Sequence, residues 1–147
     1  MFKIQKRIIY AIEAVIDIAL NSGIQPVQNI SIAKRQGIPK RYLEQTLQIL
    51  VKNKILVGSR GPKGGYRLAR ERRKITISEI IKTASNIDES HEIYKSQLSK
   101  NVIEPLIFEI TKKCFCYFDK ISVEEVYQSA KKNNIQKKQD KKVDFVI

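Results

Sequence analysis

Tryptophan is absent from this sequence, histidine and methionine occur once each, and cysteine occurs twice. A single histidine provides neither a metal-ligand cluster nor a base spaced to serve a nucleophile, so the residues give no support for an enzyme. Two cysteines are too few for a disulfide framework and favour a reducing compartment. The longest apolar stretch, residues 8–20, contains Glu13 and Asp17 and is too short to cross a bilayer, so no membrane partner is expected.

Acidic residues are scarce beside basic ones, with 15 against 28 and a net charge of +13. The excess is local. Residues 34–74 carry thirteen basic and two acidic side chains, whereas residues 75–130 carry six basic and nine acidic ones. A basic surface kept only for solubility predicts a more even spread. The concentration therefore predicts a polyanionic partner.

Helical spacing of apolar residues predicts a first helix over residues 6–20, ended by the turn signal at 21–23. A helix of two turns is expected over residues 31–36, and Gly37 ends it. Pro39 then opens a third helix that runs to about Lys52. Its apolar face consists of Leu43, Leu47 and Leu50, and its polar face includes Arg41, Glu44, Gln45 and Gln48. This order is typical of a helix-turn-helix.

Two short strands are predicted at residues 55–57 and 66–68. Four glycines and one proline lie between them, together with Arg60 and Lys63, so we expect a hairpin with a basic tip, a wing. A nucleotide-binding loop is the alternative, but the phosphate-loop spacing is absent.

Further along, Ser78 is predicted to cap a helix, and residues 88–100 have no clear period. A capping box at 101–104 predicts a long helix to about Lys120, and a second box at 122–125 predicts a last helix to about Ala130. An apolar seam along the long helix predicts a dimer contact through Ile103, Leu106, Ile110, Cys114 and Tyr117.

The expected fold is mainly α with a small β-hairpin wing. Residues 1–80 form a winged helix-turn-helix domain that binds DNA, and residues 81–130 form a helical region for dimerisation. Residues 131–147 are basic and poor in apolar residues, and we expect them to be disordered.

Three runs carry a family likeness: Tyr42–Gln45, Arg60–Tyr66 and Ile87–Ser90. With the first helix, they resemble the winged-helix transcription regulators of the IscR, NsrR and CymR type, over roughly residues 1–130. The resemblance implies a homodimer that binds double-stranded DNA at a palindromic operator. It also implies that the third helix enters the major groove and that Arg60 reaches the minor groove.

The DNA-binding residues expected on this basis are Lys40, Arg41, Tyr42, Glu44, Gln45, Gln48, Ser59, Arg60 and Lys63. Their chemistry agrees, because arginine bonds guanine or phosphate, glutamine pairs with adenine, and glutamate accepts only from a donor such as cytosine N4. Two roles stay open for Tyr42: a phosphate contact, or a wedge that holds the third helix on its neighbour.

One departure from the family concerns iron. Many relatives hold an iron–sulfur cluster with three cysteines in the loop after the Asp-Glu-Ser motif. Here the loop from His91 to Lys100 has no cysteine, and Glu104 stands where the family has a histidine ligand. We therefore expect no cluster, no other cofactor and no metal site, as in CymR, and interpret His91 as a surface residue.

Cys114 and Cys116 stand two positions apart on the predicted long helix, which directs their side chains to nearly opposite faces. They are not expected to share an ion or a disulfide. Cys114 falls on the apolar seam and is interpreted as packing. Cys116 shares its face with Lys112, Lys113 and Lys120, which favour a thiolate, so a redox role for Cys116 stays open.

The function expected is that of a sequence-specific DNA-binding transcription regulator in the bacterial cytoplasm, associated with the nucleoid. A partner enzyme, a small-molecule effector or a thiol change would supply its signal. Heavy use of isoleucine, lysine and asparagine leaves the plastid stroma as an alternative location. The alternative function is a small basic RNA- or ribosome-associated protein, although no aromatic platform for stacking bases is evident.

Overall fold

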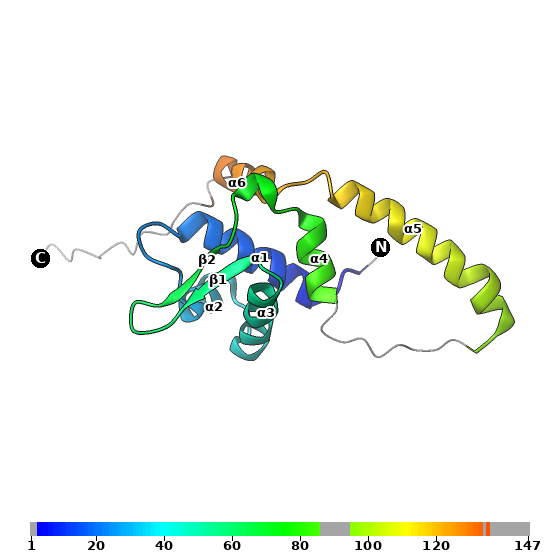
Figure 1. Ribbon diagram of the computed structural model, residues 1–147, viewed down its shortest axis with the longest axis horizontal. Helices are drawn as coiled ribbons and strands as arrows, with labels where there is room; N and C mark the ends of the chain where they lie inside the picture. Colours follow the sequence, from blue (N-terminus) through cyan, green and yellow to red (C-terminus); the bar gives the residue numbers. More distant parts are fainter. Residues whose placement is uncertain (1–2, 86–94, 134, 136–147) are drawn as a thin grey trace, which may run out of the picture.

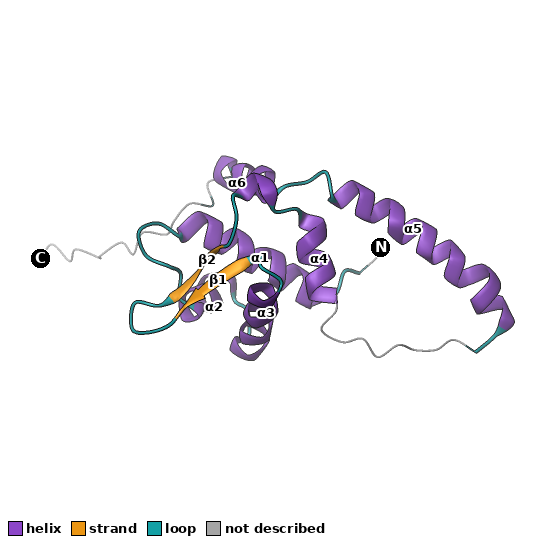
Figure 2. Ribbon diagram, in the orientation of Figure 1, coloured by secondary structure: helices purple, strands orange, loops and turns teal. Residues whose placement is uncertain are grey.

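The computed structural model describes residues 3–85, 95–133 and 135 (Figure 1). It is mostly helical with one two-stranded antiparallel sheet (Figure 2), as the sequence predicts. In chain order the elements are α1 (Lys6–Asn21), α2 (Asn29–Gln36), α3 (Lys40–Lys52), β1 (Leu56–Ser59), β2 (Gly65–Leu68), η1 (Arg72–Lys74), α4 (Ile77–Ser85), η3 (Ser99–Ile103), α5 (Glu104–Phe118) and α6 (Val123–Lys132).

The first helix is the centre of the core. α1 contacts α2, α3, α4, α6 and β2, and its residues Ala14, Val15 and Ile18 have no exposed surface. Burying a Val or Ile side chain contributes roughly 1.5–3 kcal/mol. The apolar period predicted for residues 6–20 therefore forms the packing face that holds the other helices.

The helix-turn-helix forms where it is predicted, although α2 begins two residues earlier than expected. Gly37 ends α2 in the left-handed conformation, with φ of 66°, and Ile38 in the turn is 3% exposed. In α3, Leu43, Leu47 and Leu50 are completely buried. The polar half of α3 consequently faces outward.

The wing hairpin pairs β1 with β2, with Leu56 opposite Leu68 and Ser59 opposite Gly65. The first strand begins at Leu56, one residue later than predicted, and Ile55 and Leu56 are both part of the core at 1% exposure. A further backbone bridge joins Val27, between α1 and α2, to Tyr66 in β2. The segment before α2 therefore lies beside the hairpin.

The prediction that Ser78 caps α4 is wrong. Thr76 caps this helix: its Oγ1 accepts a hydrogen bond from the Glu79 backbone N–H at 3.2 Å, and Glu79 Oε2 accepts one from the Thr76 N–H at 3.0 Å. Ser78 is buried inside α4, and its Oγ has no hydrogen-bond partner within the described ranges. Capping by Thr76 and Glu79 satisfies two N–H groups at once.

The capping box predicted at residues 101–104 is also wrong, because the chain is already helical there. A π-helical turn, η3, leads directly into α5, and the Asn101 side chain donates to Gln97 Oε1 at 3.1 Å instead of capping. Pro105 follows this turn and has no N–H to donate, which suits a local change of helical pitch. α5 ends at Phe118, two residues before the predicted end.

The second predicted capping box is confirmed at its start, since Ser122 Oγ accepts from the Glu125 N–H at 3.3 Å. α6 returns to α1, with Val123 completely buried and Tyr127 8% exposed. η3 and α5 extend away from the remaining elements (Figure 1). The division at residues 80 and 130 stays a prediction, and most of the tail predicted to be disordered lies outside the described residues.

Candidate nucleic-acid interface

The orientation of the helix-turn-helix depends on a buried carboxylate in α1. The Asp17 side chain has no exposed surface and accepts hydrogen bonds from Arg35 Nε at 2.9 Å and Nη2 at 2.7 Å. Gln36 Nε2 donates to the same carboxylate at 2.7 Å. Both donors lie in the last turn of α2, so the three bonds fix the end of α2 on α1. Such bidentate, charge-assisted bonds are strong and directional.

The exposed side of α3 is called the recognition face here, and it consists of Lys40, Arg41, Tyr42, Glu44, Gln45 and Gln48. All six residues are exposed, in agreement with the polar face expected from the sequence. Among the described residues, the side chains of Lys40, Arg41, Glu44 and Gln45 have no hydrogen-bond or ion-pair partner. Their polar groups are available for another molecule.

Tyr42 lies at the edge of this face. Its ring centroid is 6.5 Å from that of Tyr10 in α1, with the planes tilted by 44°. The contact is of the kind a wedge between α3 and α1 makes. Over half of the side chain, 56%, is nevertheless exposed, so a phosphate contact through the hydroxyl is sterically open as well.

The wing tip, defined as residues 60–64, joins the two strands of the hairpin. Ser59, Arg60 and Lys63 are exposed, and their side chains have no partner in the described part of the chain. The Gly64 N–H donates to the Gly61 carbonyl oxygen at 2.9 Å, which closes the turn. The tip therefore presents two cations on a hydrogen-bonded loop.

A groove of about 780 Å³ separates the wing from the helix-turn-helix. It brings together three of the predicted DNA-binding residues, Gln48 of α3 with Ser59 and Arg60 of the wing. Sequence reasoning missed the opposite wall, which is formed by Gln28, Asn29 and Ile30. Nothing in their local sequence indicates this role, because contacts distant in sequence, among them the bridge between Val27 and Tyr66, bring them beside the wing.

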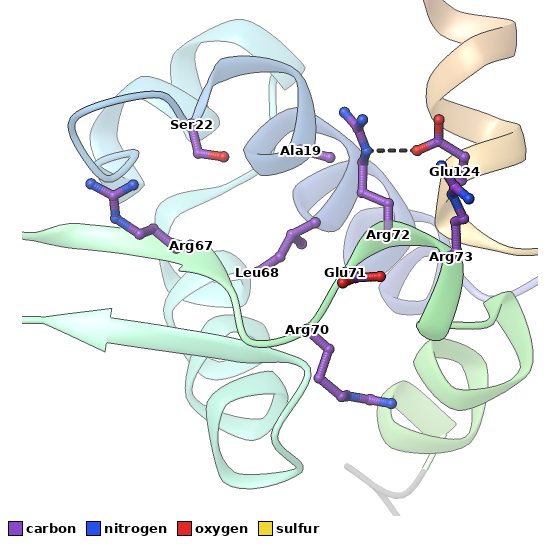
Figure 3. A pocket seen from close by; sticks show the side chains of 9 residues that line it. All are labelled: Ala19, Ser22, Arg67, Leu68, Arg70, Glu71, Arg72, Arg73 and Glu124. Atoms are coloured by element: carbon purple, nitrogen blue, oxygen red, sulfur yellow. Dashed lines mark ion pairs between the residues drawn. The ribbon is translucent and has the colours of Figure 1, made fainter.

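The basic residues of segment 34–74 do not form one surface. Arg67 lies in β2, and Arg70, Arg72 and Arg73 lie on the connection from β2 to α4; the four are together called the connector arginines. With Glu71, Glu124, Ala19, Ser22 and Leu68 they line a pocket of about 620 Å³ beside the end of α1 (Figure 3). The local concentration of charge in the sequence therefore does not by itself define one footprint.

Three connector arginines are already bonded within the protein. Arg70 donates to Glu79 Oε1 and to the Lys74 carbonyl oxygen, both at 3.0 Å. Arg72 pairs with Glu124 Oε2 at 2.6 Å, and its guanidinium lies 3.7 Å from the centroid of the Tyr127 ring. The third, Arg67, donates to two backbone carbonyls. Arg70 and Arg72 thus join the connection after β2 to α4 and α6, and Arg67 joins β2 to the segment after α1.

Among the residues that the structure describes, burial, hydrogen bonds and charge shift the pKa of three ionisable groups. The pKa of Glu13 is raised because the carboxyl is partly buried, and its Oε2 has no hydrogen-bond partner. The pKa of Glu124 is lowered, chiefly by the hydrogen bond from Gln128 and further by the charge of Arg72. The pKa of Tyr127 is lowered as well, chiefly by Lys131. All three groups lie on α1 or α6.

The predicted dimer contact is an exposed apolar face in the single chain. Ile103, Leu106, Ile110 and Tyr117 are 43%, 53%, 48% and 73% exposed, and Cys114 is exposed as well. No residue of α5 is buried, although Phe115 and Phe118 pack partly against the core. Apolar surface of this extent on one helix is unusual for a protein that remains monomeric.

The cysteines of this chain differ in number and placement from the ligands that an iron–sulfur cluster needs. Clusters take mainly thiolates, commonly four. The chain has two cysteines, and both are exposed on α5, about 200° apart around its axis. In the described ranges no three His, Cys, Asp or Glu side chains are grouped as a metal site. The available donors do not fit a cluster held within one chain.

None of the described helices combines the length and the apolar character needed to cross a membrane.

Comparison with known proteins identifies a family. The family model described as "Rrf2: Iron-dependent Transcriptional regulator" matches residues 4–129. The transcriptional regulator IscR of Xenorhabdus nematophila is 32% identical over 138 residues, which cover 89% of this chain and 82% of that protein. IscR of Cronobacter sakazakii is 42% identical over 88 residues, a match that spans about half of the relative, 52% of its length.

Solved structures of similar fold include regulators of the same type. IscR of T. potens superposes with a TM-score of 0.72 at 30% identity, covering 90% of each chain. CymR, described as the global cysteine regulator of B. subtilis, superposes with a TM-score of 0.65 at 25% identity, covering 88% of this chain and 98% of CymR. Both likenesses extend beyond the helix-turn-helix to most of the chain.

Proposed function

The chain belongs to the Rrf2 family of transcriptional regulators, and from that premise we propose that it is a homodimeric, sequence-specific DNA-binding regulator. The observation that carries the proposal is the recognition face with the wing tip beside it. Both present polar or cationic side chains that have no partner among the described residues. A winged helix-turn-helix uses these two elements to read base edges and to contact the backbone.

The proposed contacts are divided by chemistry. Arg41, Glu44 and Gln45 read bases in the major groove, because their side chains offer distinct donor and acceptor patterns. Arg60 reads the width of the minor groove, where the potential of a narrow groove attracts arginine. Lys40, Lys63, Ser59 and Gln48 hold the duplex through phosphate, and Tyr42 acts as either wedge or phosphate contact.

The experiment that tests DNA recognition is selection from a pool of random duplexes, followed by footprinting of the selected fragment. We expect a two-fold symmetric site whose halves are a helical turn or a multiple of a turn apart. A matched pool of RNA hairpins serves as competitor. Enrichment of RNA rather than duplex DNA would instead support the alternative function, a small basic RNA-binding protein.

The dimer is proposed to form through the exposed apolar face of α5. Ile110→Lys places a charge in the middle of that face, where burial without a partner is costly. We expect a folded monomer that has lost most of its operator affinity. Thr111→Lys is the control, because it adds the same charge one position further along and about 100° around the helix. An Ile110→Lys protein that sediments as a dimer would place the interface elsewhere.

We further propose that the protein binds DNA without an iron–sulfur cluster, on the ground of its two cysteines on different faces of α5. Anaerobic purification followed by iron and sulfide analysis tests this directly. Stoichiometric iron with visible absorption, lost in Cys114→Ser, would contradict it. Any signal is then supplied by a small molecule, a partner enzyme or oxidation of Cys116, and no catalytic activity is proposed.

The curated relatives named above are bacterial proteins, which favours the bacterial cytoplasm over a plastid as the place where this regulator acts.

A further inference from the structure

The wing is fastened to the segment between α1 and α2 by several contacts on one side. The backbone N–H of Val27 donates to the Tyr66 carbonyl oxygen at 2.9 Å, and the N–H of Tyr66 donates to the Val27 carbonyl oxygen at 2.8 Å. Gly65, the residue before Tyr66, has a φ of 153°, and a Cβ at this position would lie 2.5 Å from the Val27 oxygen. Glycine is thus required for the close approach of the two backbones.

Arg67 adds a side-chain contact to this side of the hairpin. Its Nη1 donates to the Gly23 carbonyl oxygen at 2.6 Å, and its Nη2 donates to the carbonyl oxygen of Ile24. Figure 3 shows Arg67 leaving β2 toward the loop that follows Ser22, at the end of α1. A planar guanidinium with both terminal nitrogens bonded has a fixed direction, which a lysine ammonium does not provide.

The wing tip has a contact of its own to the same segment. Gln28 Nε2 donates to the Pro62 carbonyl oxygen at 3.2 Å. Gln28 and Pro62 are both exposed, so this bond is a latch at the surface rather than part of the core. Arg60 stands two residues before Pro62 and has no partner among the described residues.

We propose that Arg67, assisted by Gln28, is the positioning residue of the wing: it holds the hairpin on the segment of residues 23–28 so that Arg60 meets DNA from a fixed place. The inference rests on the proposed DNA-binding function. Arg67 contributes to recognition without touching DNA, because its guanidinium is bonded to two protein carbonyls. A hairpin held in advance loses less conformational freedom on binding than one that is free to move.

The first measurement needs no DNA. Trypsin cleaves after Arg60 and Lys63, and mass spectrometry of the intact, full-length protein follows the two cuts separately from cuts elsewhere. In Arg67→Met, which keeps an unbranched apolar stem, we expect cleavage at the wing tip to be about tenfold faster, because local opening becomes more frequent. Lys74→Met is the control: it removes one exposed cation of η1 and should leave wing cleavage unchanged.

The second measurement is a double-mutant cycle between Arg67 and Arg60 on the selected operator. Arg60→Ala alone should weaken operator binding roughly 10- to 100-fold. In the Arg67→Met background the same change should cost less than about threefold, because an unanchored Arg60 no longer contributes. In the Lys74→Met background its effect should be undiminished. The thermal midpoint of each variant shows that the comparison is between folded proteins.

The outcomes distinguish the positioning of the hairpin by Arg67 from the DNA contact made by Arg60. Faster wing cleavage together with the lost effect of Arg60→Ala supports the proposal. Wild-type cleavage of the Arg67→Met wing, or a full effect of Arg60→Ala in that background, overturns it. Faster cleavage with no effect of Arg60→Ala on operator binding in any background would mean that Arg67 holds the hairpin but that the wing does not contact DNA as proposed.

A milder pair of variants protects the test against misfolding. If Arg67→Met does not fold, Arg67→Lys keeps the charge and Gln28→Ala removes only the exposed latch to Pro62. Each should accelerate cleavage after Arg60 by a smaller factor than Arg67→Met. Unchanged cleavage in both would overturn the proposal.

Discussion

The basic residues of segment 34–74 form two groups that differ in what their charged ends touch. Lys40, Arg41, Arg60 and Lys63, on the recognition face and the wing tip, have no partner in the described part of the chain. Three of the four connector arginines are bonded to carbonyl oxygens or carboxylates instead. A cation that is already bonded within the protein has less to offer a phosphate.

The formal charge of segment 34–74 is therefore larger than the charge that its free side chains can offer to DNA. The segment carries a net charge of +11 from thirteen basic and two acidic side chains, but part of that charge stabilises the fold. Arg35 belongs to the bonded group too, through Asp17. We therefore expect changes in the bonded group to alter the free energy of unfolding, and changes in the free group to alter DNA affinity.

The largest effect is expected when a bonded arginine loses its buried partner. Asp17→Ala leaves Arg35 and Gln36 without the carboxylate that joins α2 to α1. Breaking a buried pair on one side commonly costs about 3–5 kcal/mol. Urea unfolding should show this loss, whereas Glu44→Ala on the recognition face should change the free energy of unfolding by less than about 0.5 kcal/mol. A loss below about 1 kcal/mol in the free energy of unfolding of Asp17→Ala would contradict the role assigned to the bonds from Arg35 and Gln36 to Asp17.

The second effect concerns the free cations and should appear in DNA binding alone. Arg60→Ala should lose about 1–3 kcal/mol of operator affinity and discriminate less between sequences. Lys63→Ala should weaken binding to all sequences alike and reduce the log–log salt slope by roughly 0.9. Titrations on operator and random duplexes at several salt concentrations measure both. Unchanged operator affinity of Arg60→Ala would remove the wing from the interface.

The third prediction concerns Arg72, a bonded connector arginine, whose loss should affect stability and not DNA binding. Arg72→Ala removes the ion pair with Glu124 and the stacking on Tyr127, which should lower the free energy of unfolding in urea, by less than Asp17→Ala does because both groups are partly exposed. Operator affinity should stay within about twofold, because this guanidinium faces α6. A strong loss of DNA binding with unchanged stability would mean that the connector belongs to the DNA interface after all.

The smallest effect is a dependence of stability on pH at the same ion pair. The pKa of Glu124 is lowered in the folded protein, first by Gln128 and then by Arg72, so the ionised carboxylate stabilises the fold. That contribution is present above the ordinary pKa of 4.5 and is lost as the pH falls through the folded value. Glu124→Gln should therefore have a lower thermal midpoint than the parent at pH 7, and the gap should close in acid. A constant gap would contradict this.

Much of the fold follows from local sequence signals. The apolar period of residues 6–20, the glycine after α2 and the serine cap of α6 all act within a few residues, and each forms as predicted. The predicted caps of α4 and α5 are wrong for different reasons: a neighbouring residue caps α4, and α5 continues from a turn that is already helical. Thr76 wins over Ser78 because Ile75 and Ile77 are buried in the core, which decides where the helix begins.

Local sequence is enough to predict the helix-turn-helix and the polar outer face of α3, because residues that repeat at helical spacing share a face, and the glycines and proline between two apolar runs predict the wing. Which cations are free depends on packing between distant elements. Arg35 meets Asp17 across 18 residues and Arg67 meets Gly23 across 44, and no short-range pattern records such pairs. The partner of a long, flexible arginine is chosen by the packing of whole elements, which forms only when the chain folds.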